Sequence, residues 1–320
     1  MTHLDARAAQ PPALDGVTDY RIIGRPRPLM WVATAVVIAL AAMVLHSIVT
    51  NPRFEWDVVA TYFFSTSVLN GLWKTIELTV VSMVIGIVIG LVIALMRISS
   101  SRVLNAVAGV YVWFFRGTPL LVQLVLLYNI SALYPSISIG IPFGPTFFEG
   151  SVNQIVTPYV VAVAALALNE AAYMAEIIRG GLLSVDHGQL EASRALGMSG
   201  SRAMRRIVLP QAMRFIIPPT GNEVLSLLKS TSLVSVIALP ELLYSVQVVY
   251  SRTFETIPLL MVATIWYLIV TSILMVGQQL LERFYARGSS RASGAGSLQR
   301  LTGIRFRRRA TSATQTGEQR

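Results

Sequence analysis

Long apolar segments constrain this chain more than any other feature of its sequence. A helix needs about 20 apolar residues to cross a hydrocarbon core of about 30 Å. Six segments approach or exceed that length: 29–50, 71–97, 108–131, 156–179, 211–238 and 258–283. Since 54% of the 320 residues are hydrophobic, only 13% are charged and the mean hydropathy is +0.61, the sequence predicts an all-α polytopic membrane protein with six transmembrane helices.

Basic residues predict the orientation of these spans, because lysine and arginine concentrate in cytoplasmic loops. With the N-terminus placed in the cytoplasm, most of the 26 basic residues fall in the two tails, the loop after the second span and the region before the fifth. The exceptions are Arg53, Lys74, Arg116, Lys229 and Arg252. We therefore expect both termini in the cytoplasm, and topology rather than nucleic-acid binding explains the net charge of +10.

The ends of the chain differ in composition from the spans. Residues 1–28 and 286–320 are rich in Pro, Ala, Arg, Ser, Gly and Thr, which predicts disordered cytoplasmic tails. The basic tail 286–320 either rests on anionic membrane lipid or has no role, and the sequence leaves both open. Segment 29–50 starts too late and is too long for a cleaved signal peptide, so we expect it to be a first, anchoring transmembrane helix.

A charged stretch between the fourth and fifth spans has the pattern of two short helices. It runs from Gly188 to Pro210, and small apolar residues at helical spacing form one face between positions 192 and 196. Gly197 is expected to end the first helix, while Ser199 or Ser201 can cap the second. A compact helix-turn-helix between spans is suited to docking onto another protein.

The same stretch resembles the EAA loop of the membrane subunits of bacterial ABC importers. The pattern of Glu-Ala-Ala, Gly and Ile-x-Leu-Pro is present with every spacing kept, and a serine in place of the second alanine is the single departure. The resemblance implies that this cytoplasmic loop couples the chain to a separate ATPase. The residues concerned are Gly188, Glu191, Ala192, Ser193, Gly197, Ile207, Leu209 and Pro210.

Two further segments, 115–123 and 169–180, resemble the polar amino acid branch of these permeases, the histidine, glutamine and arginine type. The resemblance covers about residues 65–285 and implies a five-helix type I ABC importer core, to which segment 29–50 adds one N-terminal helix. It also implies a dimer of ATPase subunits, a second permease subunit (identical or related), and an extracytoplasmic binding protein that delivers a polar amino acid. The expected location is the bacterial inner membrane.

Ionisable residues inside a span are costly, so each needs a partner or a function. Arg116 and Glu170 lie at similar depths in neighbouring spans, roughly 12–14 Å from the cytoplasmic surface at about 1.5 Å per residue. Equal depth allows an ion pair, which either ties two helices together or contacts a zwitterionic substrate. Nearby, Gly117 is expected to allow close helix approach and Pro119 to loosen the helix.

The fifth span carries several polar residues beside two prolines. Pro218 and Pro219 are expected to break the helix near mid-depth, where exposed backbone groups need a cavity or a ligand. Asn222, Ser226 and Lys229 share one helical face, which either lines the translocation path or forms helix–helix hydrogen bonds. The candidate path residues are therefore Arg116, Glu170, Asn222, Glu223, Ser226 and Lys229.

No catalytic, cofactor or metal site is expected. The chain has no cysteine, its three histidines lie far apart, and it lacks the G-x-x-x-x-G-K-[ST] phosphate loop. We therefore predict a non-catalytic permease subunit that works by alternating access while a partner hydrolyses ATP. The alternative is an ion-coupled secondary amino acid transporter with Arg116, Glu170, Glu223 and Lys229 as a relay, which leaves the EAA spacing unexplained.

Overall fold

The structure, a computed structural model, describes residues 28–141 and 146–286. Its chain divides into two units, Met1–Phe54 and Glu55–Arg320. Almost all of both expected tails lies outside the described residues, so their disorder stays a prediction.

The first unit is described from its apolar helix onward. Helix α1 (Pro28–Thr50) has 23 residues with none of Asp, Glu, Lys or Arg, and the short 3-10 helix η1 (Pro52–Phe54) follows it. A stretch of 18 residues within α1 has a mean hydropathy of 2.4, and the length and composition of the helix suffice for a membrane span.

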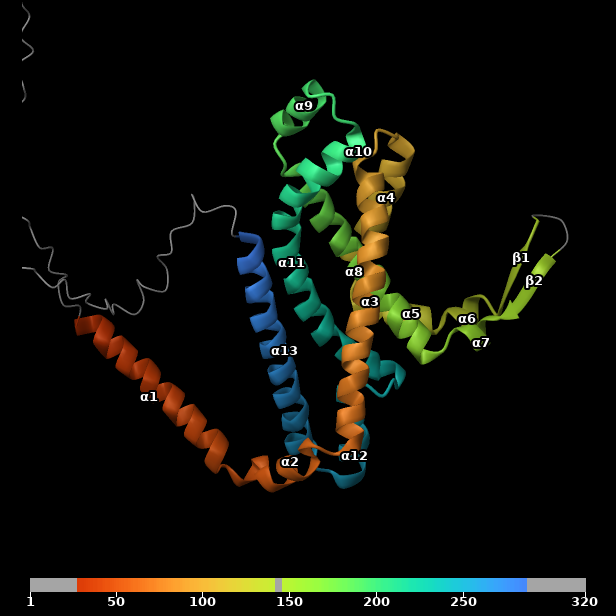
Figure 1. Ribbon diagram of the computed structural model, residues 1–320. Coiled ribbons are helices and arrows are strands. Elements are labelled where there is room, and N and C mark those ends of the chain that lie inside the picture. Colours follow the sequence, from red (N-terminus) through yellow and green to blue (C-terminus); the bar gives the residue numbers. More distant parts are fainter. Residues whose placement is uncertain (1–27, 142–145, 287–320) are drawn as a thin grey trace, which may run out of the picture. The chain divides into compact units, whose positions relative to one another are not determined.

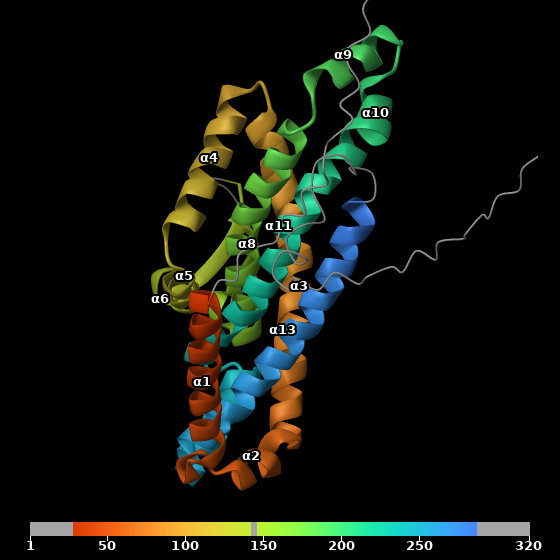
Figure 2. The ribbon, with the colours of Figure 1, turned by 90° about the vertical axis from the view of Figure 1, so that its left-hand side faces the viewer.

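The second unit is a helical bundle with one small hairpin (Figure 1). Its elements are α2 (Trp56–Phe63), α3 (Thr66–Ile98), α4 (Arg102–Gly117), α5 (Leu120–Tyr128), α6 (Ile130–Leu133), β1 (Ser136–Gly140), β2 (Thr146–Ser151), α7 (Val152–Ile155), α8 (Pro158–Leu183), α9 (His187–Ala195), α10 (Gly200–Ala203), the π-helix η2 (Met204–Val208), α11 (Leu209–Ser230), the 3-10 helix η3 (Thr231–Ile237), α12 (Leu242–Thr253) and α13 (Thr256–Ala286). The all-α class is confirmed, although the antiparallel pair β1–β2 was not expected. Helices α9 and α10 lie at one end of this unit and α2 at the other (Figure 2).

Four described helices are long and apolar enough to span a membrane alone: α1, α3, α8 and α13. The count rises to six if two bent helix pairs are each taken as one span. One pair is α4 with α5, which meet at 101° beside Pro119, the residue that was expected to loosen the helix of the third span. The physical reason for the bend is that Pro119 has no N–H to continue the hydrogen-bond ladder across it.

The fifth span breaks at a different place from the one expected. Helix α11 continues through Pro218 and Pro219 and ends at Ser230, so the prediction of a break at the prolines is wrong. Tertiary contacts hold the helix there, because a Cβ on Gly221 would lie 2.6 Å from Gln278 Cδ of α13. Gln278 Nε2 also donates a hydrogen bond to the Pro218 carbonyl at 3.4 Å. Packing thus overrides the local effect of the prolines.

Helices α3 and α8 form the centre of the second unit, and glycine permits their close approach. A Cβ on Gly90 would lie 2.7 Å from Met174 Cβ and 3.0 Å from the Ala171 carbonyl oxygen. Small residues at such positions let helix backbones approach, which is the main source of packing energy between helices in lipid. Around this contact lies the larger apolar core, which α5, α11 and η3 complete.

A polar junction separates this core from a second one formed by α2, α12, and the first turns of α3 and α13. Glu241 precedes α12, is fully buried, and accepts hydrogen bonds from the N–H groups of Leu243 and Tyr244 at 2.9 and 2.7 Å. Tyr267 of α13 donates to the same carboxylate at 3.1 Å, and Thr75 of α3 at 3.4 Å. The junction therefore caps α12 and connects three helices.

We expect Gly90→Ala to lower the thermal stability of the purified protein in detergent. The added methyl group would overlap the backbone of α8, and overpacking of this kind costs about 1–3 kcal/mol. Gly180→Ala is the matched control, since nothing lies within 4 Å of a Cβ at that helical position. Equal melting temperatures for the two variants would contradict the proposed close packing of α3 on α8.

Candidate functional site

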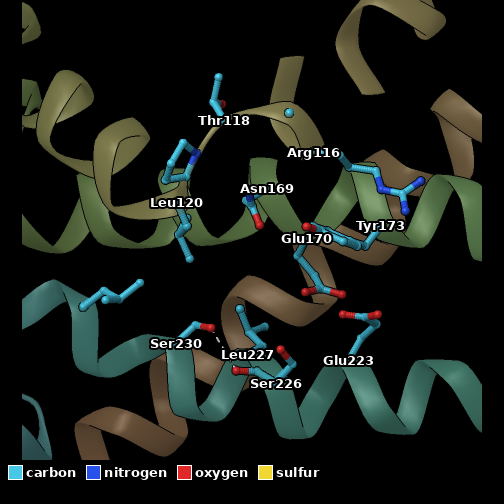
Figure 3. Close-up of a pocket in the computed structure, with 13 residues that line it drawn as sticks. Arg116, Thr118, Leu120, Asn169, Glu170, Tyr173, Glu223, Ser226, Leu227 and Ser230 are labelled. Carbon is cyan, nitrogen blue, oxygen red and sulfur yellow. Dashed lines mark hydrogen bonds between the residues drawn. The ribbon is translucent and has the colours of Figure 1, made fainter. Parts of the chain in front are cut away.

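A polar cavity of about 540 Å³ lies where the bend between α4 and α5 meets α8 and α11 (Figure 3). Its size falls within the range of small-molecule sites in proteins, about 300–1,000 Å³. The lining residues are Arg116, Gly117, Thr118, Pro119, Leu120, Asn169, Glu170, Tyr173, Glu223, Ser226, Leu227, Ser230 and Leu233.

Four of the six candidate path residues line this cavity: Arg116 from α4, Glu170 from α8, and Glu223 and Ser226 from α11. Asn222 and Lys229 do not, and both side chains are exposed elsewhere on α11. The Asn222 side chain instead accepts a hydrogen bond from Gln278 of α13 at 3.1 Å. The polar face of α11 toward the cavity is thus rotated by one residue from the face expected.

The face that α11 presents to the cavity consists of Glu223, Ser226, Leu227 and Ser230, at i, i+3, i+4 and i+7. Helical spacing in the sequence fits this face and the face that carries Asn222, Ser226 and Lys229 equally well. Only the packing of α11 beside α8 shows which of the two faces the cavity. The sequence also gave no signal for Tyr173, which faces the cavity one helical turn beyond Asn169 and Glu170.

Two carboxylates face one another across the cavity. Figure 3 shows the side chains of Glu170 and Glu223 pointing toward each other from α8 and α11. Glu170 is 4% exposed, and within the described ranges its Oε1 atom has no hydrogen-bond partner. Gly86 of α3 makes room for this side chain, since a Cβ there would lie 2.9 Å from Glu170 Cγ. Such a pair of carboxylates favours binding of a cation.

The arginine of the cavity has a different partner from the one expected. Within residues 28–141 and 146–286, no ion pair joins Arg116 to Glu170, so the prediction of that pair is wrong. The Arg116 guanidinium carbon instead lies 5.0 Å from the ring centroid of Tyr173, within the range of a cation–π contact. A guanidinium bound through its face leaves its N–H groups free for an anionic ligand group.

Gly117 also departs from its expected role. Nothing lies within 4 Å of a Cβ built at this position, so it supports no close helix contact. It lies at the end of α4, where it forms part of the cavity wall. In the described part of the chain, no group of three or more acidic or histidine side chains is arranged to hold a metal ion.

The stretch after α8 forms a capped helix and a tight turn. Helix α9 starts after Asp186, whose Oδ1 accepts a hydrogen bond from the Gly188 N–H at 2.7 Å. The helix ends at Ala195 with Leu196 as its C-cap, and the next residue, Gly197, has φ of +70°. The Gly197 N–H bonds to the Arg194 carbonyl at 2.9 Å, and the next N–H bonds to the Ser193 carbonyl at 3.0 Å. These two bonds form a Schellman motif, which explains why glycine occupies this position.

Helix α9 exposes most of the residues of the EAA pattern. Glu191 and Ala192 are exposed, and Leu196 is 80% exposed at the end of the helix. Ser193 is the buried member, and its hydroxyl donates to the Leu190 carbonyl at 2.7 Å. Helix α9 lies at one end of the second unit (Figure 1), and its exposed residues Ala192 and Leu196 are suited to contact with a protein partner.

The second half of the pattern runs without interruption into the membrane span. Ser199 precedes α10 but makes no side-chain capping bond. The π-helix η2, which contains Ile207, follows, and the Leu209 N–H bonds to the Met204 carbonyl across its wider turn. Pro210 comes directly after this turn, and the local π geometry accommodates a proline that would disrupt a regular helix.

Apolar spans, an exposed helix-turn-helix and a polar cavity between spans together define a membrane transport subunit. Residues 86–287 match the family described as "binding-protein-dependent transport system inner membrane component", and the chain belongs to this family. It is 47% identical over 277 residues to the arginine transport system permease protein ArgU of Corynebacterium glutamicum, a match that covers 86% of this chain and 85% of the relative. It is also 35% identical to the L-cystine transport system permease protein TcyB of Bacillus subtilis, over 75% of this chain and 94% of that one.

Solved structures support the same assignment. The chain is similar to a subunit in the crystal structure of an amino acid ABC transporter with histidines, with 36% identity and a TM-score of 0.60. That match covers 70% of this chain and 96% of the other. A subunit of the methionine ABC transporter MetNI, at 18% identity and a TM-score of 0.56 over 68% and 96% of the two chains, shares the fold.

We expect Gly197→Ala to weaken the turn after α9. A side chain in the left-handed region costs roughly 1–2 kcal/mol, so local opening should rise about 5- to 30-fold. Hydrogen exchange of the amides between residues 190 and 200 measures this opening. Gly200→Ala is the control, because its backbone is not left-handed and its Cβ would meet nothing within 4 Å. Identical exchange in both variants would contradict the role of the left-handed glycine.

Proposed function

We propose that this chain is the permease subunit of an ATP-driven ABC importer for amino acids, and that its substrate is cationic. The family and the named permease relatives support the first part. The facing carboxylates of Glu170 and Glu223 in the cavity carry the second part. A cationic amino acid has two positive groups and one carboxylate, which matches two acidic side chains beside one arginine.

Each charged residue of the cavity then has a role. Glu170 and Glu223 bind the positive groups of the substrate, and the unpaired Oε1 of Glu170 is one of the acceptors. The guanidinium of Arg116 binds the substrate carboxylate with the N–H groups that its contact with Tyr173 leaves free. Ser226 and Ser230 supply neutral hydrogen-bonding groups on the opposite wall. Asn222 and Lys229 stay candidates for other parts of the path.

Helix α9 is the proposed contact to the ATPase. Its exposed face at the end of the second unit would fit a groove on that partner, with Glu191, Ala192 and Leu196 in the contact. Closure of an ATPase dimer around ATP would move α9, and α8 and α11 on either side of it would transmit the movement to the cavity. This chain does not itself hydrolyse ATP in the proposal, since it has no phosphate loop.

The remaining partners follow from this scheme. A second permease subunit would complete the path, and an extracytoplasmic binding protein would deliver the amino acid on the side opposite α9. The distribution of basic residues supports a cytoplasmic position for α9 and for both termini. The description of the family supports a location in the inner membrane. Membership of the ABC transport family favours ATP-driven uptake over the ion-coupled alternative.

The purified complex of permease and ATPase, without the binding protein, should bind arginine more tightly than glutamine or glutamate. Glu170→Gln and Glu223→Gln should each weaken arginine binding about tenfold or more, since a charged hydrogen bond contributes about 1.5–3 kcal/mol. Equilibrium binding of radiolabelled arginine measures the affinity. Asp57→Asn is the control, because this exposed carboxylate of α2 lies outside the cavity. Preferential glutamate binding, or full arginine affinity in both variants, would refute a cationic substrate.

Glu191→Lys should abolish uptake and co-purification of the ATPase, while the permease still inserts into the membrane. The change reverses a charge on the exposed face of α9 without altering buried contacts. Uptake in cells and affinity purification from mild detergent measure the two effects. Gln189→Lys places a lysine on the same helix at an exposed position outside the EAA pattern, and it should retain the ATPase. An intact complex with normal uptake in Glu191→Lys would refute the docking role.

A further inference from the structure

The bend between α4 and α5 leaves the Phe115 carbonyl without its helical donor. In a regular helix the Phe115 carbonyl would accept from the N–H of residue 119, but that residue is Pro119 and has none. The Thr118 carbonyl, in extended backbone at the end of α4, is a second acceptor at the bend. Within a bilayer an unsatisfied backbone group costs several kcal/mol, so both carbonyls need donors from elsewhere.

Two side-chain amides supply these donors. Gln123 of α5 is 4% exposed, and the two N–H groups of its Nε2 are shared among the Phe115 carbonyl at 3.0 Å, the Thr118 carbonyl at 3.1 Å and the Thr118 hydroxyl at 2.7 Å. Asn169 of α8 donates from Nδ2 to the same Phe115 carbonyl at 3.0 Å. The second bond of that Nδ2 goes to Gln123 Oε1 at 3.1 Å. The C-terminal end of α4 is therefore connected by hydrogen bonds both to α5 and to α8.

These residue types suit the arrangement for a chemical reason. Gln123 must donate to carbonyls through one end of its amide and accept from Asn169 through the other. A carboxylate at either position could accept but not donate, and an apolar side chain could do neither. Position 123 therefore needs a side chain that both donates and accepts, and position 169 needs one that donates to two acceptors; glutamine and asparagine meet these requirements.

The residue next to the shared carbonyl is Arg116, and residues 116–120 form one wall of the cavity. We propose that Gln123 and Asn169 form an amide clamp that fixes the α4–α5 bend and so positions Arg116 for the substrate carboxylate. Gln123 does not line the cavity, so it acts through Arg116 rather than on the substrate. The inference rests on the proposed function, in which Arg116 binds that carboxylate.

Binding of two ligands to the purified complex of permease and ATPase tests the clamp. Arginine has the carboxylate, whereas its decarboxylated analogue agmatine has the same guanidinium and amine without it. Gln123→Met removes the amide at similar volume and should weaken arginine binding about tenfold, while agmatine affinity stays within about twofold. Arg116→Gln should weaken arginine binding by a similar factor, and combining the two changes should add little to either.

A matched control comes from the same pair of helices. The Tyr111 hydroxyl donates to the Leu168 carbonyl at 2.7 Å, which also links α4 to α8, and neither residue lines the cavity. Tyr111→Phe should leave arginine affinity within about twofold.

The outcomes separate the clamp from the proposed function. If Arg116→Gln leaves arginine affinity unchanged, the carboxylate role of Arg116 fails, and the clamp proposal fails with it. If Arg116→Gln weakens arginine binding but Gln123→Met does not, only the clamp is refuted. Equal loss of arginine and agmatine binding in Gln123→Met would indicate general damage to the fold and would also refute a positioning role.

Discussion

The close contact between α3 and α8 supports the rest of the second unit. Gly90 lets the two backbones meet, and Gly86, one turn earlier, makes room for the Glu170 side chain. The same contact therefore packs the bundle and places an acidic group at the cavity. In a lipid environment, where apolar side chains gain little by leaving the solvent, such close packing has to supply much of the energy that holds helices together.

Backbone hydrogen bonding explains why two proline sites in this chain behave differently. At Pro119 the chain turns by 101°, and side-chain amides bond to the carbonyls at the bend. At Pro218 and Pro219 the helix continues, and on this stretch α13 packs against Gly221 and donates a hydrogen bond to the Pro218 carbonyl. A proline removes one donor in either case. Its neighbours in space decide whether a bend follows.

The cavity joins residues that lie far apart in the sequence. The facing carboxylates come from α8 and α11, and the arginine comes from the end of α4. The periodicity of α11 was compatible with more than one polar face. Asn222 and Lys229, which were chosen from the sequence, each lie one position before a residue that lines the cavity, Glu223 and Ser230. The sequence also did not predict the partner of Arg116, because Tyr173 and Glu170 lie on the same face of α8 one turn apart, and an estimate of depth in the membrane does not distinguish them.

The sequence by itself determined the membrane class, most of the long helices and the turn at Gly197, because these depend on local composition, apolar length and backbone conformation. The EAA pattern could likewise be recognised from the sequence, because all its residues lie in one continuous stretch of the chain. Only the tertiary structure decided where the fifth span breaks, which face of α11 meets the cavity, and that Glu170 and Glu223 face one another. Those features depend on contacts between helices, and such contacts leave no fixed spacing in a single sequence.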